Sequence, residues 1–377
     1  MIKEIEYDTN LVVGAGFTGA TIAKLVSENL NEKVLVIDKR NHLAGNCYDY
    51  KDENNITIHK YGSHIFHTND QNVWDFVSRF ADFNTYMHKV IAVIDGIETT
   101  IPFNFNTLYD VFPKSLATRL EKKLLDCFEY NKKIPILKFQ EQEDDDLKFL
   151  AEYIYEKIFL NYTQKQWGVD PKNICKSVTS RVPVFLSKDN RYFQDKYQGI
   201  PLKGYTDLIN NMLKDKNINV SLNTEYKDIK DKKYKRIFYT GSIDEFFGYK
   251  YGKLPYRSVK FKIETVDQEY YQVNSVVNYP CNYDFTRIHE YKYYLNEKSN
   301  KTVIAKEYSE EFELGKNERY YPIIKDENIL LHNKYIEEAK KLDDVYFLGR
   351  LGDYKYYDMD KSILRAIELF NKEVIKK

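Results

Sequence analysis

The residues LVVGAGFTGA (11–20) decide the fold that we expect of this chain. A hydrophobic run typical of a buried parallel strand breaks into glycines at 14, 16 and 19, and the helical pattern TIAKLVSENL follows. The stretch KVLVIDKR (33–40) then predicts a second strand, which ends at Asp38. Strand, glycine turn, helix and acid together predict a βαβ unit with the G-x-G-x-x-G spacing of dinucleotide-binding folds.

The chemistry of a bound dinucleotide explains each of these residue types. Gly14 permits the tight turn, Gly16 lets the backbone approach a pyrophosphate, and Gly19 allows the helix to pack closely. The N-terminus of the helix faces the phosphates. Asp38 is placed to accept hydrogen bonds from a ribose diol. The context therefore predicts dinucleotide binding, with an ordinary glycine turn as the alternative.

A second glycine near the C-terminus bears on which dinucleotide is bound. DDVYFLGR (343–350) predicts a late strand, and Gly349 and Arg350 precede a helical pattern with apolar residues on one face. FAD folds often return to the cofactor in this way because the flavin spans both ends of the domain, whereas NAD enzymes need no such return. The sequence therefore favours FAD.

Composition excludes some classes of function. Of the 377 residues, 43% are hydrophobic, and Lys+Arg equals Asp+Glu at 57 each, so no basic excess points to nucleic acid or an anionic membrane. The N-terminus MIKEIEYDTN is charged, and the chain has no 18-residue apolar run. Its cysteines (Cys47, Cys127, Cys175, Cys281) are scattered. We expect a cytoplasmic protein without nucleic-acid or membrane partners.

Between 105 and 178 the pattern predicts an inserted helical domain. Leu116, Leu120 and Leu124 share one face of a helix that begins at Pro113, and the acidic run EQEDDD (141–146) precedes a second helical stretch. VIAVIDGIETTIPF predicts a hairpin with DG at its turn, and 256–310 predicts an antiparallel sheet. The expected fold is α/β: a Rossmann-type FAD-binding domain (1–90 with 203–245 and 340–377), a helical bundle (105–180), and an antiparallel β-sheet domain (90–105 with 181–202 and 246–339).

Two stretches leave alternatives open. His59, His64 and His67 invite a metal site, but no carboxylate or cysteine pattern completes one, so no metal is predicted and the segment 62–68 is interpreted as a loop. NYTQKQWG (161–168) is interpreted as a turn-like stretch after a helix, with a helix C-terminus capped by Gly168 as the alternative.

Several specific motifs make the chain recognisable, above all HIFHT, the QW of YTQKQWG, YQGIP and YKYYDM. With GAGFTGA, VLVIDKRNH, PFNFNT and RVPV they run nearly end to end, and together they resemble the bacterial UDP-galactopyranose mutase family. The resemblance implies an FAD domain, a helical bundle with a mobile lid, and an antiparallel sheet. It also implies a homodimer and a role in cell-surface polysaccharide synthesis.

The resemblance implies a flavoenzyme without net redox chemistry. In the mechanism that the resemblance implies, reduced FAD attacks the anomeric carbon of UDP-galactopyranose through N5 and displaces UDP. The flavin–sugar adduct opens as an iminium, O4 closes the five-membered ring, and UDP returns. The galactose pair, its 2-acetamido form or both are the expected substrates, since Ser63 stands where the family often has a small apolar residue. An FAD-dependent oxidoreductase of the amine-oxidase type and a non-catalytic nucleotide-sugar binding protein are the alternatives.

The family's functional residues carry over onto matching positions. The catalytic set is Arg181, Arg287 and His64. The implied substrate-binding residues are Asn84, Tyr162, Thr163, Trp167, Arg181, Tyr192, Phe193, Arg287, Tyr321, Tyr356 and Asp358. The implied cofactor-binding residues are Gly14, Gly16, Phe17, Thr18, Gly19, Asp38, Lys39, Arg40, Gly45, Asn46, His64, Ile65, Gly349, Arg350, Tyr357, Asp358 and Met359.

Overall fold

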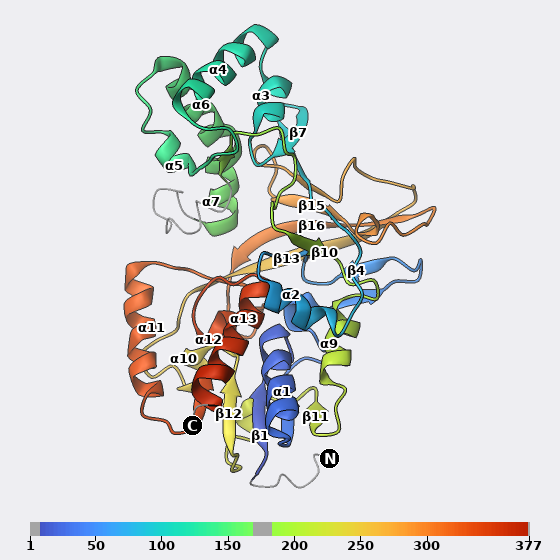
Figure 1. Cartoon of the computed structure of the whole chain (residues 1–377), viewed down its shortest axis with the longest axis vertical. Coiled ribbons are helices and arrows are strands. Elements are labelled where there is room, and N and C mark those ends of the chain that lie inside the picture. The colour runs from blue at the N-terminus through green and yellow to red at the C-terminus, as the bar shows by residue number, and fades with distance from the viewer. Residues whose placement is uncertain (1–7, 169–182, 376–377) are drawn as a thin grey trace.

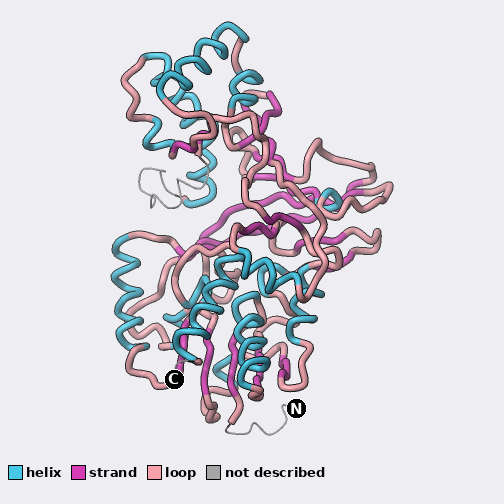
Figure 2. Tube along the Cα trace, viewed as in Figure 1, coloured by secondary structure: helices cyan, strands magenta, loops and turns pink. Residues whose placement is uncertain are grey.

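A computed structural model of the chain describes residues 8–168 and 183–375. Figure 1 shows a parallel sheet with its helices at one end, the helices α3 to α7 at the other, and a second sheet between them. The tube in Figure 2 makes the separation plain, because the strands gather in the lower and middle parts while the upper part is mostly helix.

The strands and helices have the following bounds. The strands are β1 (Asn10–Val13), β2 (Val34–Ile37), β3 (Asp49–Lys51), β4 (Thr57–His59), β5 (Phe66–Thr68), β6 (Val90–Ile94), β7 (Ile97–Ile101), β8 (Lys133–Ile134), β9 (Val184–Phe185), β10 (Tyr197–Gly199), β11 (Ile218–Ser221), β12 (Arg236–Tyr239), β13 (Tyr256–Val266), β14 (Val276–Asn278), β15 (Arg287–Glu290), β16 (Thr302–Glu311), β17 (Tyr321–Pro322) and β18 (Val345–Phe347). The α-helices are α1 (Phe17–Leu30), α2 (Gln71–Ser78), α3 (Phe105–Val111), α4 (Lys114–Cys127), α5 (Ile136–Phe139), α6 (Asp145–Ile154), α7 (Asn161–Trp167), α9 (Tyr205–Leu213), α10 (Ile243–Phe246), α11 (Asp326–Ala339), α12 (Gly349–Gly352) and α13 (Met359–Leu369).

The parallel sheet has the order β11-β2-β1-β12-β18. Its strands are apolar on both faces because both faces are covered. Val12, Val36 and Phe238 face the core beneath α1, α9 and α13, whereas Leu11 and Leu35 face the opposite side. Continuous burial of this kind is typical of parallel sheets. The predicted βαβ unit and Rossmann-type fold are confirmed.

The second sheet has seven strands in the order β17-β13-β16-β15-β14-β6-β7. It is antiparallel except where β14 runs parallel to β6. The β6–β7 hairpin turns at Asp95 and Gly96, whose φ angles of 50° and 86° suit the DG turn predicted from the sequence. The division of the chain into three discontinuous domains stays a prediction.

The register of this sheet lines up one row of side chains across neighbouring strands. Glu307 lies opposite both Phe261 and Arg287, and Arg287 lies opposite Asn278 on its other side. Directly opposed side chains on one face of a sheet lie within contact range. The row therefore places a carboxylate, a guanidinium and an amide side by side.

The predicted helices form with the expected buried faces. Leu120 and Leu124 of α4 are fully buried, as are Leu147 and Leu150 of α6, or nearly so. The acidic run ends in a cap, since Asp144 accepts hydrogen bonds from the N–H groups that begin α6. In the described part of the chain, no helix is long and apolar enough to span a membrane.

Two local interpretations were wrong. Residues 66–68, expected within a loop, form β5, which pairs with β10 across a long stretch of chain. Residues 161–167, expected as a turn, form α7, and Gly168 caps it in the left-handed region with φ of 70°. The alternative stated for this stretch, a helix capped by glycine, is the observed structure.

Candidate active site

A cavity of about 280 Å³ lies between the antiparallel sheet, α7, the loop before β5 and the start of α13. Its lining comes from distant parts of the chain, from Asn46 to Met359. It contains charged, aromatic and histidine side chains together. The geometry of each group decides what the cavity can bind.

Arg287 lies on the cavity wall contributed by the sheet. Its Nε donates to Glu307 at 3.1 Å, and His289 lies 2.9 Å from the other oxygen of the same carboxylate. Although burial alone would raise the pKa of Glu307, the neighbouring Arg287 and His289 lower it to about 2. Burial would lower the pKa of the guanidinium, but Glu307 raises it well above its usual value. This wall therefore carries a fixed ion pair.

Arg350 is a second cation in the cavity, and backbone carbonyls hold it in place. Its Nη atoms donate to the carbonyls of Tyr320 and Tyr357 at 3.3 and 2.6 Å. Its guanidinium lies 5.0 Å from the ring of Tyr356, which stacks on Tyr321 with 5.3 Å between centroids. Two tyrosines and an arginine thus form one aromatic and cationic corner.

His64 presents an acceptor nitrogen. Its Nδ1 lies 2.7 Å from the carbonyl of Gly62, which can only accept, so Nδ1 carries the proton and Nε2 is bare. Burial lowers the pKa of His64 to about 3. The imidazole is therefore neutral at pH 7 and can accept a hydrogen bond through Nε2.

Helix α7 supplies the aromatic end of the cavity. Tyr162, Thr163 and Trp167 all line it, and Trp167 is 8% exposed. Its indole lies 5.8 Å from the ring of Tyr321, and the Tyr162 ring lies 5.9 Å from the guanidinium of Arg287. Flat aromatic surface beside a cation suits a heterocyclic base joined to an anionic group.

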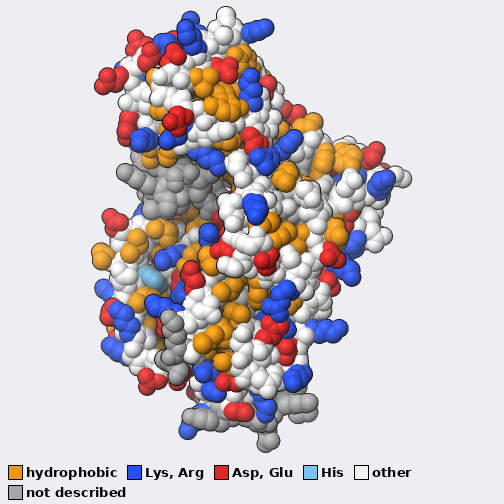
Figure 3. All heavy atoms as spheres, viewed as in Figure 1, with side chains coloured by type: hydrophobic (Ala, Val, Ile, Leu, Met, Phe, Trp, Pro, Cys, Tyr) orange, Lys and Arg blue, Asp and Glu red, His pale blue; other side chains and the backbone are white. Residues whose placement is uncertain are grey.

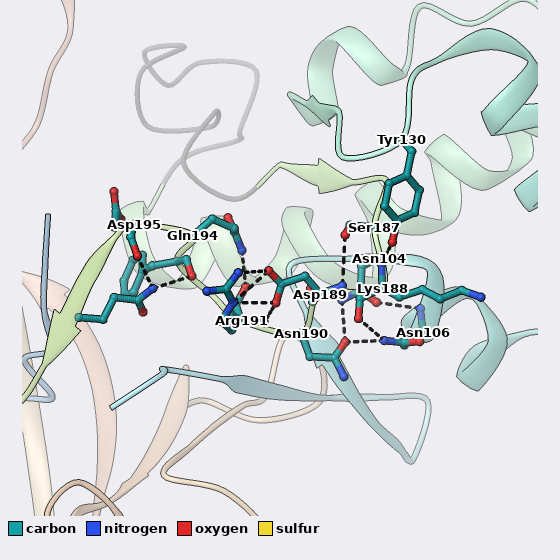
Figure 4. A network of polar contacts seen from close by, with 12 residues as sticks. Asn104, Asn106, Tyr130, Ser187, Lys188, Asp189, Asn190, Arg191, Gln194 and Asp195 are labelled. Atoms are coloured by element: carbon teal, nitrogen blue, oxygen red, sulfur yellow. Dashed lines mark hydrogen bonds and ion pairs between the residues drawn. The ribbon is translucent and has the colours of Figure 1, made fainter. Parts of the chain in front are cut away.

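Tyr192 and Phe193 reach the cavity from a segment that a polar network fixes in place. Figure 4 shows Asn190 bonded to Asn104 and Asn106 at the start of α3, at 3.0 and 2.7 Å. Arg191 pairs with both carboxylate oxygens of Asp189. Because these contacts flank the aromatic pair, the segment is anchored on the side of the helical part.

The β1–α1 turn lies apart from this cavity and shows why glycines occupy it. Gly14 has a φ of 108°, and a Cβ there would lie 2.1 Å from Thr240. A Cβ at Gly19 would lie 1.9 Å from the Gly14 carbonyl. At Gly16, by contrast, it would meet only a Cα of Gly45, at 3.8 Å. The turn leaves an open face over Gly16.

The structure brings most of the expected site residues together in two places, the cavity and the β1–α1 turn. Asn84 does not line the cavity, because its side chain bonds to the backbone of Tyr294 and Ile200. Lys39 and Arg40 pair with Glu318. Arg181 lies outside the described residues. Lining the cavity are Asn46, His64, Ile65, Tyr162, Thr163, Trp167, Tyr192, Phe193, Arg287, Tyr321, Arg350, Tyr356, Asp358 and Met359; at or beside the turn are Gly14, Gly16, Phe17, Thr18, Gly19, Asp38, Gly45 and Gly349.

The lining residues that sequence reasoning missed include His88, Asn278, His289 and Glu307. A usable signal was present in RIHE (287–290), where Arg287 and His289 alternate on one strand and so share a face. Two ionisable residues on the same face of a strand indicate a polar site when that face is buried. His67, considered for metal, instead pairs with Asp195 at 2.8 Å.

The comparisons with known proteins find relatives that match almost the whole chain. The family model for UDP-galactopyranose mutase matches residues 157–356. The dTDP-fucopyranose mutase of Escherichia coli is 38% identical over 95% of this chain and 96% of its own length. The UDP-galactopyranose mutase of Mycoplasma genitalium is 35% identical over 95% and 93%. The chain belongs to the UDP-galactopyranose mutase family.

Further matches support the fold of this mutase-family chain. A model for an NAD(P)-binding Rossmann-like domain matches residues 12–80. A crystal structure of reduced UDP-galactopyranose mutase has a TM-score of 0.72 at 16% identity, covering 99% of this chain and 95% of the other. Putrescine oxidase bound to putrescine has a TM-score of 0.56 at 10% identity over 98% and 99%. Both structural likenesses show the fold alone.

As a member of this mutase family, the chain is an isomerase whose cofactor is FAD. The residues at the β1–α1 turn fit its pyrophosphate, because the backbone at Gly16 faces open space and no side chain caps α1. Asp38 accepts from the N–H groups of Ala15 and Arg40 at 2.9 Å, one on each oxygen. Each oxygen keeps a second lone pair for a ribose hydroxyl.

Proposed function

We propose that this chain interconverts UDP-galactopyranose and UDP-galactofuranose without net oxidation or reduction. The observation that supports this best is the hydrogen bonding of the Arg287 guanidinium. Its Nε is tied to Glu307, and within residues 8–168 and 183–375 neither Nη nitrogen has a hydrogen-bond partner. A guanidinium held at one nitrogen, with its fork facing a cavity, suits a diphosphate that must leave and return.

The remaining residues supply the other contacts in this proposal. Arg350, with Tyr321 and Tyr356 against it, adds a second positive charge for the diphosphate. Trp167 and Tyr162 offer ring faces for the uracil base. Arg181 keeps its expected role beside Arg287 as a proposal from the sequence.

The reaction must exchange ring atoms while conserving the composition of the sugar. The bond from the anomeric carbon to UDP breaks and later re-forms, O5 leaves the ring, and O4 takes its place. Reduced FAD, when bound, would supply the electron pair for nucleophilic catalysis at the anomeric carbon. His64 can accept a hydrogen bond from a group beside it through Nε2, and it stays uncharged at neutral pH.

The nucleotide sugar has a second candidate. The Escherichia coli relative, 38% identical, is named a dTDP-fucopyranose mutase, whereas a probable UDP-galactopyranose mutase of Klebsiella pneumoniae is 36% identical over 95% of this chain and 92% of its own length. Both identities are similar, so dTDP-fucose joins UDP-galactose and its 2-acetamido form as substrates to test. The cytoplasmic location and the homodimer stay predictions from the sequence.

One experiment tests the proposal. The dithionite-reduced protein is incubated without oxygen with UDP-galactose, UDP-N-acetylgalactosamine or dTDP-fucose, and products are separated by anion-exchange chromatography. We expect a furanose product and many turnovers after a single reduction, with none from the oxidised protein. Sodium cyanoborohydride added during turnover should leave one sugar attached to FAD, detected by mass spectrometry. Reductant consumed in proportion to product would instead indicate an oxidoreductase.

A further inference from the structure

A line of polar contacts runs from one wall of the cavity to Arg287. The hydroxyl of Tyr294 bonds to Ser63 Oγ, and Ser63 Oγ lies 2.5 Å from Nδ1 of His289. Nε2 of His289 lies 2.9 Å from one oxygen of Glu307, and the other oxygen accepts from Arg287 Nε at 3.1 Å. His289 is 1% exposed and Glu307 5%.

The proton positions along this line are fixed. Arg287 and His289 hold Glu307 as a carboxylate, which can only accept, so Nε2 of His289 must carry a proton. Burial lowers the pKa of His289, which favours the neutral ring and leaves Nδ1 bare. Ser63 therefore donates to Nδ1 and accepts from Tyr294. Each contact contains one proton, and the order of donors and acceptors cannot reverse while Glu307 is charged.

The sheet register explains why His289 and Arg287 address different oxygens. They are two residues apart on β15 and share a face, and Glu307 lies directly opposite Arg287 on β16. Thr286 also donates to the oxygen used by Arg287, at 3.1 Å. Thr286 and Arg287 thus donate to one oxygen of Glu307 and His289 bonds to the second, which also lies 3.1 Å from Arg287 Nε.

We propose that Ser63 and His289 are positioning residues that control how Arg287 meets a diphosphate. If the second oxygen of Glu307 lost its bond to His289, it would be a buried acceptor without a donor. The nearest charged side chain is Arg287, whose Nε lies 3.1 Å from this oxygen while donating to the other one. A turn of the guanidinium would bring an Nη nitrogen to the freed oxygen, and such a two-pronged pairing is favourable. His289 prevents that pairing because its Nε2–H already bonds to the second oxygen. Ser63 donates to Nδ1 and so keeps the imidazole proton on Nε2. This inference rests on the proposed function, since it assigns the Nη fork to the diphosphate.

Substitutions separate the contributions of Ser63 and His289 to this line of polar contacts. In His289→Phe the ring remains but both bonds are lost, so Arg287 should turn toward Glu307 and the Kd for UDP should rise about tenfold or more. His289→Gln retains an N–H able to reach Glu307, so its Kd should stay within about threefold of wild type. Ser63→Ala removes the donor that fixes the tautomer, and we expect an increase of about threefold to tenfold.

The matched control is Ser275→Ala. Ser275 is fully buried and bonds to Tyr86 at 2.7 Å, so this change also deletes a buried serine–tyrosine contact, but neither residue lines the cavity. We expect its Kd for UDP to equal that of wild type. Thermal unfolding of all variants records any general loss of stability. If Ser63 and His289 only stabilise the fold, their variants should unfold at a lower temperature without a change in the Kd for UDP.

The measurements are calorimetric UDP binding to the FAD-loaded protein and ¹⁵N NMR of histidine-labelled protein without nucleotide. We expect a neutral His289 protonated at Nε2, with a shift of its Nδ1 signal in Ser63→Ala. Wild-type UDP affinity in both Ser63→Ala and His289→Phe would overturn the proposal, as would a His289→Gln defect equal to that of His289→Phe. If His289→Phe does not fold, the other two variants decide. A wild-type protein that binds no UDP would overturn the proposed function, and the line of polar contacts would then be judged by the His289 tautomer.

Discussion

Lowering the pH should destabilise this protein through histidines that are buried without charge. Burial lowers the pKa of both His59 and His88 to about 3, and each has a ring nitrogen without a partner among the described residues. The exposed fractions are 1% and 5%. His59 also packs against the ring of Tyr294, at 5.1 Å. A proton added to either ring would therefore place an unpaired charge in the interior.

The direction and size of the effect follow from linkage. In the unfolded chain these rings have their usual pKa near 6.5, so between pH 6.5 and pH 3 the unfolded state binds more protons than the folded state. The contribution is complete above pH 6.5 and is lost as the pH falls. At pH 5.5 each ring costs about 1.4 kcal/mol relative to pH 7.5, or about 3 kcal/mol for both. This value does not depend on the folded pKa as long as that pKa lies well below 5.5.

Equilibrium urea unfolding of the FAD-saturated protein at pH 7.5 and 5.5, followed by far-ultraviolet circular dichroism, measures this difference. The test variant is His59→Asn, because its side-chain oxygen can replace Nδ1 as acceptor for the His64 N–H, now 3.1 Å away. Although its stability at pH 7.5 will fall, the difference between the two pH values should shrink by about 1.4 kcal/mol. An unchanged difference would show that His59 is not buried as a neutral ring, and the reasoning would fail.

Three further substitutions test the sites directly. Gly16→Val should abolish FAD binding, because a branched side chain fills the open face of the turn; a variant purified with full flavin content would contradict the assigned pyrophosphate site. Arg287→Ala should keep its flavin and lose about 2–5 kcal/mol of transition-state or UDP binding; unchanged kcat/KM would remove it from the site. Trp167→Ala should weaken UDP binding by about 1–3 kcal/mol, measured by calorimetry, if the indole stacks on the base. Unchanged affinity would indicate that Trp167 only packs against Tyr321.

The sequence predicted the features whose causes are local. Gly14, Gly19 and Asp38 lie within one βαβ unit, so spacing alone indicates the turn and its ligand class. The DG hairpin and the helix ending at Gly168 are likewise decided by backbone preferences of a few residues. The resemblance to a family supplied the identities of distant site residues, most of which the fold brings to one cavity.

The missed features depend on contacts between segments far apart in the chain. Residues 66–68 form a strand only because 197–199 pair with them, and no local pattern near either stretch specifies the other. The same holds for Glu307, which can pair with Arg287 only because the strand register places the two residues opposite each other. A shift of one residue would turn Glu307 to the other face. Sequence patterns indicate which face of a strand is polar. Which residue lies opposite on the neighbouring strand is determined only when the sheet assembles.

The strand order of the parallel sheet has a consequence for synthesis on the ribosome. β1 emerges early, yet its neighbour β12 (Arg236–Tyr239) follows some 200 residues later, and the edge strand β18 (Val345–Phe347) comes close to the end. At about 5–20 residues per second, the apolar edge of β1 waits on the order of 10–40 s for its partner. Asp358 and Met359 of the cavity arrive last. The cavity is therefore completed only after β12, β18 and the residues near 358 have emerged.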